Sequence, residues 1–561
     1  MEADVVGTHH LCRCMPLLSQ TMHCYSNLPH KQIKTYRIIM KISYSLSIGI
    51  LVLSFLSHRF YSKYYDSTPC SLDPPIEIDG IGWGNGATNG RYTFRDSCTL
   101  FSTEYVEARD KFRAAVKAYN ATLEDEGEVL ELWSSLVSKK DGEPFSLEVA
   151  VIPGNSAKLG TIVHSSGVHG VEGYAGSSIQ LALLELFTSL SKQKESGFGA
   201  DDRPTVVLVH VVNPVGMSQY RRYNENNVDL NRNGIILTEE PTISRKSNDR
   251  KDEHRHRDDG IYRSFREFVD KRDPNIAGYD DFRDLFVPTV KETGINHLSF
   301  YENTIGYFAR AIPAIARYGL PALKRGMVAG QYHHPEGLNY GGQSFQPSLE
   351  RLLDVFVRDR PEFFLDSSRV VWIDVHTGLG PFGKDSVLRH AHSKQPKKEE
   401  GEKCDLELDD YLTTAYSVTS SVAGGQSTAQ AFKGYDLSKG MLMEFLGDKY
   451  QKMVAVSNSL GSDVGEGDTT KPSDKEAIFM VQEFGTLPTI LVGRALILDN
   501  MLYQYQKSRH QTKERFVYKS PYLGYAFYPQ STEWRRSLVQ RGVAIVLQAM
   551  EYSTARSKLR C

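Results

Sequence analysis

The sequence predicts an α/β fold in which helices cover both faces of a central sheet. Short runs rich in β-branched residues alternate with helical segments along most of the 561-residue chain, and this alternation is typical of α/β proteins. The strand candidates are almost entirely apolar, as strands buried on both faces are. Hydrophobic residues make up 40% of the chain and charged residues 24%, which is ordinary for a large globular protein.

The predicted elements lie within a folded domain that we place at 96–555. Apolar residues spaced by three and four positions predict an amphipathic helix over 103–119, and the apolar segment 173–191 predicts a second helix. The strand candidates are FSLEVAVI at 145–152, TIVH at 161–164, TVVLVHVV at 205–212, VVWIDV at 370–375, MLMEFL at 441–446 and IFMVQE at 478–483.

Two highly charged segments interrupt this pattern, at 238–259 and 393–410. Such segments are typical of solvated loops, and we place insertions near 238–350 and 393–410. His254 and His256 fall in the first segment. Because their surroundings are so polar, a solvated loop is favoured there over a metal site.

The N-terminal region predicts entry into the secretory pathway. Residues 42–57 read ISYSLSIGILVLSFLS and follow Lys34, Arg37 and Lys41. An apolar run this short, with a basic flank, favours a signal anchor or signal peptide at 40–58 over an ordinary membrane span of about 20 residues. We therefore expect a single-pass type II membrane protein, or a secreted one. Residues 1–39 form a tail that lies upstream of a second candidate start, Met40.

Residues 59–95 contain proline, glycine and serine without periodicity, which predicts a stem between the anchor and the domain. Cys70 and Cys98 are candidates for a disulfide there. Asn120-Ala-Thr122 is a glycosylation sequon, as expected of a lumenal glycoprotein. The formal net charge of −2 gives no reason to expect a nucleic-acid partner. Membrane contact is expected only through residues 42–57, if they are not cleaved.

Four short motifs occur in order along the domain: His169-Gly-Val-Glu172, Asp229-Leu-Asn-Arg232, Asp374-Val-His376 and Gln482-Glu483-Phe-Gly485. They contain two imidazoles and a carboxylate for a metal, another carboxylate for a base, and an Asn/Arg pair for an anion. Most follow or end an apolar run, and sites in open α/β sheets form at the carboxyl ends of strands. The set predicts a zinc hydrolase that recognises a carboxylate.

Two residues on one strand carry part of this prediction. Asp374 lies two positions before His376, on the same strand face, so its carboxylate can orient that imidazole. Each motif alone also has an ordinary explanation. His-x-x-Glu occurs by chance, a histidine after a strand is often a hydrogen-bonded loop residue, and Glu483 could cap a turn. The ordered set of four favours the site.

The motifs, together with Asn213-Pro-Val-Gly216 and Arg222, resemble the zinc carboxypeptidase superfamily of carboxypeptidase A type. Five segments of the sequence are similar to a subgroup of this superfamily that is described as a domain of unknown function, number 2817. The segments are SGVHGVEGYAGS, RRYNENNVDLNRN, GQYHHPEGLNYGG, DVHTGLGPFG and EFGT. The resemblance spans about residues 145–486. It implies a carboxypeptidase-like mixed central sheet with helices on both faces, preceded by the signal anchor and stem.

The resemblance also implies a role for each site residue. One zinc ion per chain would be held by His169, Glu172 and His376, and Glu483 would be the general base. Arg222 would stabilise the oxyanion, with its neighbour Arg221 as the alternative. Asn231 and Arg232 would hold the carboxylate of the substrate. The substrate would be a peptide or an acylated amino acid with a free carboxylate.

The chain departs from the digestive carboxypeptidases in two places. No tyrosine lies at 458–466, where those enzymes carry one that closes over a peptide, and material at about 238–351 is inserted. Within the insertion, His333 and His334 lie in a segment that resembles a pocket loop. They are candidates for substrate binding, and a plain turn with stacked aromatics is the alternative.

We expect a metallocarboxypeptidase-like hydrolase that cleaves a peptide or amide bond next to a carboxylate. The Asp-x-His-Thr wording around His376 also resembles the acylase branch of the superfamily. An N-acyl amino acid deacylase or amidase is therefore the second expectation. A catalytically inactive peptide-binding domain is the alternative from another class.

Overall fold

The structure, a computed structural model, describes residues 67–78, 91–123, 131–140, 143–192, 198–235, 267–272, 275–287, 307–389, 421–422, 438–461, 475–509 and 518–558. The chain divides into two units, Met1–Lys63 and Tyr64–Cys561, and every described residue belongs to the second. The expected tail and signal anchor at 1–58 lie outside the described residues. So do the expected charged loops at 238–259 and 393–410. Across the described ranges, no helix combines the length and apolarity needed to cross a bilayer.

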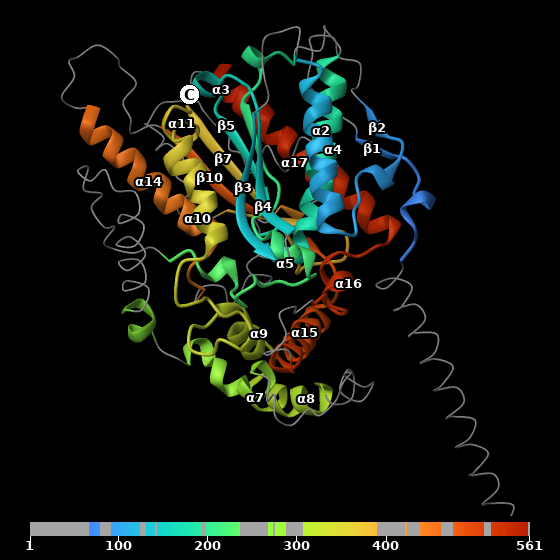
Figure 1. The fold of residues 1–561 in the computed structure, drawn as a ribbon, viewed down its shortest axis with the longest axis vertical. Coiled ribbons are helices and arrows are strands. Elements are labelled where there is room, and N and C mark those ends of the chain that lie inside the picture. The colour runs from blue at the N-terminus through green and yellow to red at the C-terminus, as the bar shows by residue number, and fades with distance from the viewer. Residues whose placement is uncertain are drawn as a thin grey trace, which may run out of the picture. The chain divides into compact units, whose positions relative to one another are not determined.

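A mixed sheet lies at the centre of the fold (Figure 1). It has eight strands in the order β3-β4-β6-β5-β7-β10-β8-β9. Its four central strands, β6, β5, β7 and β10, run parallel to one another. Strands β3, β4 and β8 pair antiparallel, and β9 pairs parallel with β8. The strands are β3 Glu131–Lys140, β4 Glu143–Ile152, β5 Thr161–Ser166, β6 Thr205–Val209, β7 Arg369–Gly378, β8 Asp385–Arg389, β9 Ser421–Val422 and β10 Glu476–Gly485.

Helices cover both faces of the sheet, because the strands are apolar on both faces. One face packs against α2 (Tyr105–Asn120), α4 (Gly173–Ser191) and α17 (Thr532–Lys558), and these elements form one buried cluster. The other face packs against α10 (Pro347–Leu353), α11 (Glu362–Leu365) and α14 (Leu442–Gly461), which form a second cluster. The α/β prediction with helices on both faces is confirmed. The predicted helix at 173–191 coincides with α4.

Further helices lie beyond the ends of the central strands (Figure 1). Helices α7 (Arg283–Phe286), α8 (Tyr307–Tyr318), α9 (Leu320–Ala329), α15 (Thr489–Arg509) and α16 (Leu523–Phe527) share a third apolar cluster. Because α15 begins just after β10 ends, this cluster lies at the carboxyl ends of the parallel strands. The remaining short α-helices of the described residues are α3 (Ser156–Leu159) and α5 (Pro214–Ser218).

Two sequence predictions are wrong. The run MLMEFL at 441–446 opens helix α14 and is not a strand. Leucine, methionine and glutamate are strong helix formers, and Leu442, Phe445 and Leu446 are buried with helical spacing. The predicted stem at 59–95 is also partly folded, because β1 (Ile76–Ile78) pairs with β2 (Tyr92–Phe94) and the side chains of Ile76 and Ile78 enter the main core.

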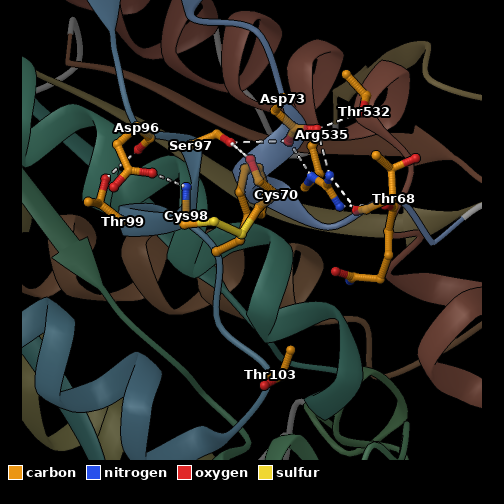
Figure 2. Close-up of a disulfide and its surroundings, with 12 residues drawn as sticks. Thr68, Cys70, Asp73, Asp96, Ser97, Cys98, Thr99, Thr103, Thr532 and Arg535 are labelled. Carbon is orange, nitrogen blue, oxygen red and sulfur yellow. Dashed lines mark hydrogen bonds and ion pairs between the residues drawn. A yellow bond between two sulfur atoms is a disulfide. The ribbon is translucent and has the colours of Figure 1, made fainter.

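The segment before β1 is hydrogen-bonded to the C-terminal helix α17 (Figure 2). Cys70 and Cys98, which the sequence offered as candidates for pairing, form a disulfide. Figure 2 shows Asp73 next to it, facing Arg535 of α17. The Asp73 carboxylate accepts hydrogen bonds from Arg535 Nε at 2.6 Å, Arg535 Nη2 at 2.7 Å and Thr532 Oγ1 at 2.6 Å. The two ends of the domain are thereby joined.

Removing the disulfide with the double substitution Cys70→Ser, Cys98→Ser should lower the free energy of unfolding by roughly 3–4 kcal/mol. The bond closes a loop with a sequence separation of 28, so it restricts the unfolded chain. Urea unfolding followed by fluorescence measures the change. Wild-type protein in reductant is the control and should lose a similar amount. An unchanged midpoint in both samples would contradict the expected stabilisation.

Candidate metal centre

The structure brings His169, Glu172 and His376 together at the carboxyl ends of β5 and β7. His169 follows β5, Glu172 ends the short 3-10 helix η3 (Gly170–Glu172), and His376 lies in β7. His169 Nδ1 is 3.0 Å from Glu172 Oε1, and His376 Nδ1 is 3.3 Å from Glu172 Oε2. One ligand atom of each residue lies within 4.8 Å of the others, and all three side chains are buried.

These three residues fit a zinc ion. A tetrahedral site with bonds of about 2.0–2.2 Å places neighbouring ligand atoms roughly 3.3–3.6 Å apart. The observed separations of 3.0 Å and 3.3 Å are close to that spacing. Two imidazoles and one carboxylate also leave a fourth position for water or substrate, as in catalytic zinc sites.

A close contact between two main-chain segments positions the first two ligands. A Cβ atom on Gly170 would lie 2.1 Å from the carbonyl carbon of Gly216, so no larger residue fits there. Gly170 N donates to Arg222 O at 3.2 Å, and Val171 N donates to Arg221 O at 2.9 Å. The turn that carries His169 and Glu172 is thereby fixed against the segment that carries Arg222.

Each candidate ligand histidine has a carboxylate at its second ring nitrogen. His376 Nε2 is 2.8 Å from Asp374 Oδ2, which is the contact expected from the sequence. His169 Nε2 is 3.2 Å from Asp229 Oδ1, a contact that we did not expect. The hydrogen bond between His376 Nε2 and Asp374 favours a proton on Nε2 and leaves Nδ1 to face the metal position, whereas His169 and Asp229 lie at ion-pair distance. The signal for Asp229 was its place at the start of the Asp-Leu-Asn-Arg motif.

Arg222 lies beside the candidate ligands. Its Nη1 atom is 3.2 Å from His169 Nδ1 and 3.6 Å from Glu172 Oε1, and its Nη2 atom is 3.0 Å from Asp229 Oδ2. Arg221 lies elsewhere: it pairs with Asp499 at 3.2 Å and is fully buried. Of the two neighbouring arginines, only Arg222 therefore has a guanidinium next to the metal position.

Glu483 lies on β10 directly opposite His376 in the strand register. Leu379 N donates to Glu483 Oε1 at 2.8 Å, so the loop after β7 holds this carboxylate. Burial raises the pKa of Glu483, and the negative charge of Glu172 raises it further. The charge of His376, the Leu379 N–H and the charge of Arg222 each lower the pKa of Glu483, but by less. The resulting pKa is about 7. A carboxylate with such a pKa can both accept and release a proton near neutral pH.

The carboxylate of Glu172 differs sharply from that of Glu483. Burial would raise the pKa of Glu172, but the imidazoles of His169 and His376 outweigh burial and lower it to about 2. Thr377 N also donates to Glu172 Oε2 at 3.1 Å. Glu172 is therefore held as an anion, the form that binds a metal, while Glu483 can carry a proton.

Asn231 and Arg232 do not have the surroundings expected of a carboxylate anchor. Arg232 is 1% exposed, and its guanidinium donates to the main-chain oxygens of Val328 and Asn231. Asn231 Oδ1 accepts from Leu442 N at 2.8 Å. The contacts differ from the predicted role because the end of α9 approaches Arg232 and presents the main-chain oxygen of Val328 to its guanidinium.

Arg232→Ala should lower the free energy of unfolding by roughly 2–4 kcal/mol, because buried carbonyl groups lose charged donors. Arg325→Ala, at an exposed arginine of α9, is the matched control and should change stability little. Urea unfolding measures both. If Arg232→Ala instead folds normally and loses activity only on substrates with a free carboxylate, the expected anchor role would be restored.

His333 and His334 lie in the loop between α9 and α10. His334 Nε2 is 3.2 Å from Asp280 Oδ1, and its ring stacks on Tyr279. Among the described residues, His333 Nε2 is buried and makes no hydrogen bond. The same loop contacts the site indirectly, since Asp229 N donates to Tyr340 O at 2.7 Å. His334 thus matches the stacked-turn alternative, and neither histidine joins the three candidate ligands.

Several solved structures align with much of the chain. Thrombin activatable fibrinolysis inhibitor is 10% identical, with 82% of this chain and 76% of that chain covered and a TM-score of 0.32. The murein-tripeptide amidase MpaA from Escherichia coli O157 is 12% identical, with 66% of this chain and 91% of that chain covered and a TM-score of 0.25. A protein assigned as carboxypeptidase A from Shewanella denitrificans OS-217 is 10% identical, with 85% of this chain and 80% of that chain covered and a TM-score of 0.27. TM-scores this low do not assign an activity to this chain.

No curated protein matches the chain in sequence. A family match covers most of it, over residues 101–458 and 447–541. This match confirms the subgroup predicted from the motifs, and the chain belongs to the family described as protein of unknown function (DUF2817).

Proposed function

We propose that this protein is a zinc-dependent hydrolase that cleaves a peptide or amide bond, in the manner of a metallocarboxypeptidase. The observation that carries the proposal is the convergence of His169, Glu172 and His376 within 4.8 Å of one another. Arg222 and Glu483 lie beside them with the charges that acyl-bond hydrolysis needs. The resemblance of the motifs to the zinc carboxypeptidase superfamily also supports it.

The side chains have distinct roles in the proposed reaction. One zinc ion, held by His169, Glu172 and His376, would polarise the acyl group and acidify water. Glu483 accepts the proton of the attacking water and then delivers it to the leaving nitrogen. The Arg222 guanidinium balances the negative charge that grows on the acyl oxygen.

The preference for a neighbouring carboxylate is the finer part of the proposal. The sequence assigned that recognition to Asn231 and Arg232, with His333 and His334 as further contacts. Because Arg232 donates to main-chain oxygens, a second candidate is favoured beside the carboxypeptidase. That candidate is an amidase or N-acyl amino acid deacylase that does not use Arg232 for its substrate. An inactive peptide-binding domain would keep zinc and bind these substrates without cleaving them.

A substrate panel tests the proposal. The purified protein with zinc is incubated with peptides that have a free or an amidated C-terminus, and with N-acyl amino acids. Products are measured by mass spectrometry. Loss of a C-terminal residue from free peptides alone supports the carboxypeptidase, whereas cleavage of amidated peptides or N-acyl amino acids supports the second candidate. Binding without cleavage of any substrate would refute both enzyme proposals.

We also propose that the domain is lumenal or extracellular, behind a signal anchor or signal peptide at 40–58. The Cys70–Cys98 disulfide supports this, because such bonds persist in oxidising compartments. Expressed in secretory cells, the protein should carry a glycan at Asn120 that glycosidase removes. Asn120→Gln should abolish the resulting mobility shift. A cytosolic, unglycosylated product would refute the location and leave the proposed chemistry untouched.

A further inference from the structure

A chain of three hydrogen bonds runs from the apolar core to His376. Trp372 Nε1 donates to Ser165 Oγ at 2.8 Å, and Ser165 Oγ donates to Asp374 Oδ1 at 2.6 Å. The other oxygen of this carboxylate, Asp374 Oδ2, is 2.8 Å from His376 Nε2. Trp372, Ser165 and Asp374 are fully buried. The chain therefore ends at a candidate metal ligand and is shielded from water along its length.

The strand register creates this chain. Trp372, Asp374 and His376 alternate along β7, so their side chains share one face of the sheet. Ser165 of β5 pairs with Asp374 in the parallel register, which places its hydroxyl beside that carboxylate. The Trp372 ring also packs against Phe356, with ring centroids 4.6 Å apart, so the indole has a fixed orientation.

The chemistry of the donors gives the chain one direction. An indole N–H can only donate, so the Ser165 hydroxyl must accept from it and send its own hydrogen to Asp374. The Asp374 carboxylate, which can only accept, then takes the hydrogen at His376 Nε2. A neutral His376 ring in this arrangement has its lone pair at Nδ1, the atom that lies 3.3 Å from Glu172.

The two candidate ligand histidines are held by different means. Asp229, which contacts His169, is bound by the charged guanidinium of Arg222 at 3.0 Å. The donors to Asp374 are the neutral hydroxyl of Ser165 and the ring of His376. The carboxylate that orients His376 is therefore held by the neutral hydroxyl of Ser165, whereas the carboxylate beside His169 is held by a charged guanidinium.

We propose that Trp372 and Ser165 are positioning residues, which act through Asp374 to hold His376 with Nδ1 toward the metal. This inference rests on the zinc site of the proposed function, but on neither its substrate nor its reaction. Groups that orient a metal ligand through hydrogen bonds change metal affinity without touching the ion. The alternative is that Trp372 only fills space in the core and that Ser165 only satisfies its indole.

The experiment compares zinc affinity among variants of the full chain. Ser165→Ala removes the hydroxyl, and Trp372→Phe keeps an aromatic ring but loses the N–H. Ser166→Ala is the matched control: Ser166 is the next residue of β5, is buried, and donates to the main-chain oxygen of His210. Zinc dissociation constants are measured by competition with a chromogenic chelator. The visible absorption spectrum of each cobalt-substituted protein reports ligand geometry.

We expect Ser165→Ala to weaken zinc binding on the order of tenfold and to alter the cobalt spectrum. Trp372→Phe should act in the same direction, and the double variant should bind about as weakly as Ser165→Ala alone, because the indole acts through the hydroxyl. Ser165→Thr, which restores a hydroxyl, should recover wild-type affinity. The Ser166→Ala control should keep both the affinity and the spectrum.

Wild-type affinity and spectrum in Ser165→Ala would overturn the proposal. So would additive effects in the double variant, or a wild-type protein that binds no zinc. If Ser165→Ala does not fold, Trp372→Phe with unchanged affinity and spectrum would overturn it in the same way. A shift in zinc affinity in a protein that cleaves no substrate would support the positioning role and refute only the hydrolase.

Discussion

Replacing Glu483 with glutamine should lower turnover by on the order of a hundredfold or more, with folding and zinc content preserved. Glutamine keeps the shape of the side chain and can still accept a hydrogen bond from Leu379 N, but it cannot accept a proton. The steady-state rate on whichever substrate the panel identifies measures the effect. Elemental analysis of the same samples measures zinc content, and urea unfolding measures their stability.

The pH profile gives this prediction a second readout. Burial and the charge of Glu172 raise the pKa of Glu483 from 4.5 to about 7 in the metal-free protein. A bound cation favours the carboxylate and lowers that pKa. The base must be deprotonated to act, so kcat/KM of the wild type should fall as the pH drops through the range between about 4.5 and 7. The residual kcat/KM of Glu483→Gln should not fall over this pH range.

Glu185→Gln is the matched control for Glu483→Gln. Glu185 is a partly buried carboxylate of α4 that accepts from Tyr92 OH at 3.1 Å, and burial raises its pKa as well. This variant should keep the wild-type rate and pH profile. Unchanged turnover in Glu483→Gln would show that another group is the base.

The double substitution His169→Ala, His376→Ala should reduce bound zinc from about one ion per chain to near zero. A lone carboxylate, Glu172, cannot hold zinc against buffer and water, since structural and catalytic sites need at least three protein ligands. Zinc is measured by elemental analysis after dialysis against metal-free buffer. Circular dichroism should show that the fold persists, because the apolar clusters on the two faces of the sheet do not contain either histidine.

His334→Ala is the control for the loss of zinc. His334 pairs with Asp280 in a loop and is not among the three candidate ligands. This variant should keep about one zinc per chain. Full zinc retention in the double variant would mean that other side chains bind the ion and would contradict the proposed site.

Continuous apolar runs made the fold predictable. The strands at 145–152, 161–164 and 370–375 and the helix at 173–191 consist of residues that require burial, so their order along the chain fixes an α/β arrangement. The strand prediction at 441–446 is wrong because a short, mostly apolar run fits a strand as well as one face of a helix. Its leucine and methionine content favours the helix, and packing of α14 on the sheet decides it.

The sequence by itself determined which residues can form the metal site. His169 with Glu172 and Asp374 with His376 are recognisable because each pair needs only local chain geometry, a tight turn in one case and strand alternation in the other. Glu483 belongs to the same ordered set of motifs, whereas Arg222 came from the resemblance to the zinc carboxypeptidase superfamily.

Only the tertiary structure decided how distant segments meet at the site. In Asp229-Leu-Asn-Arg232, it is Asp229 that contacts His169, whereas Arg232 donates to the main chain of Val328, which is far away in sequence. Ser165 reaches Asp374 through the pairing of β5 with β7. The spacing of residues in a motif cannot predict such contacts. They depend on how strands pair and on which distant segments pack together, and many residues along the chain determine these.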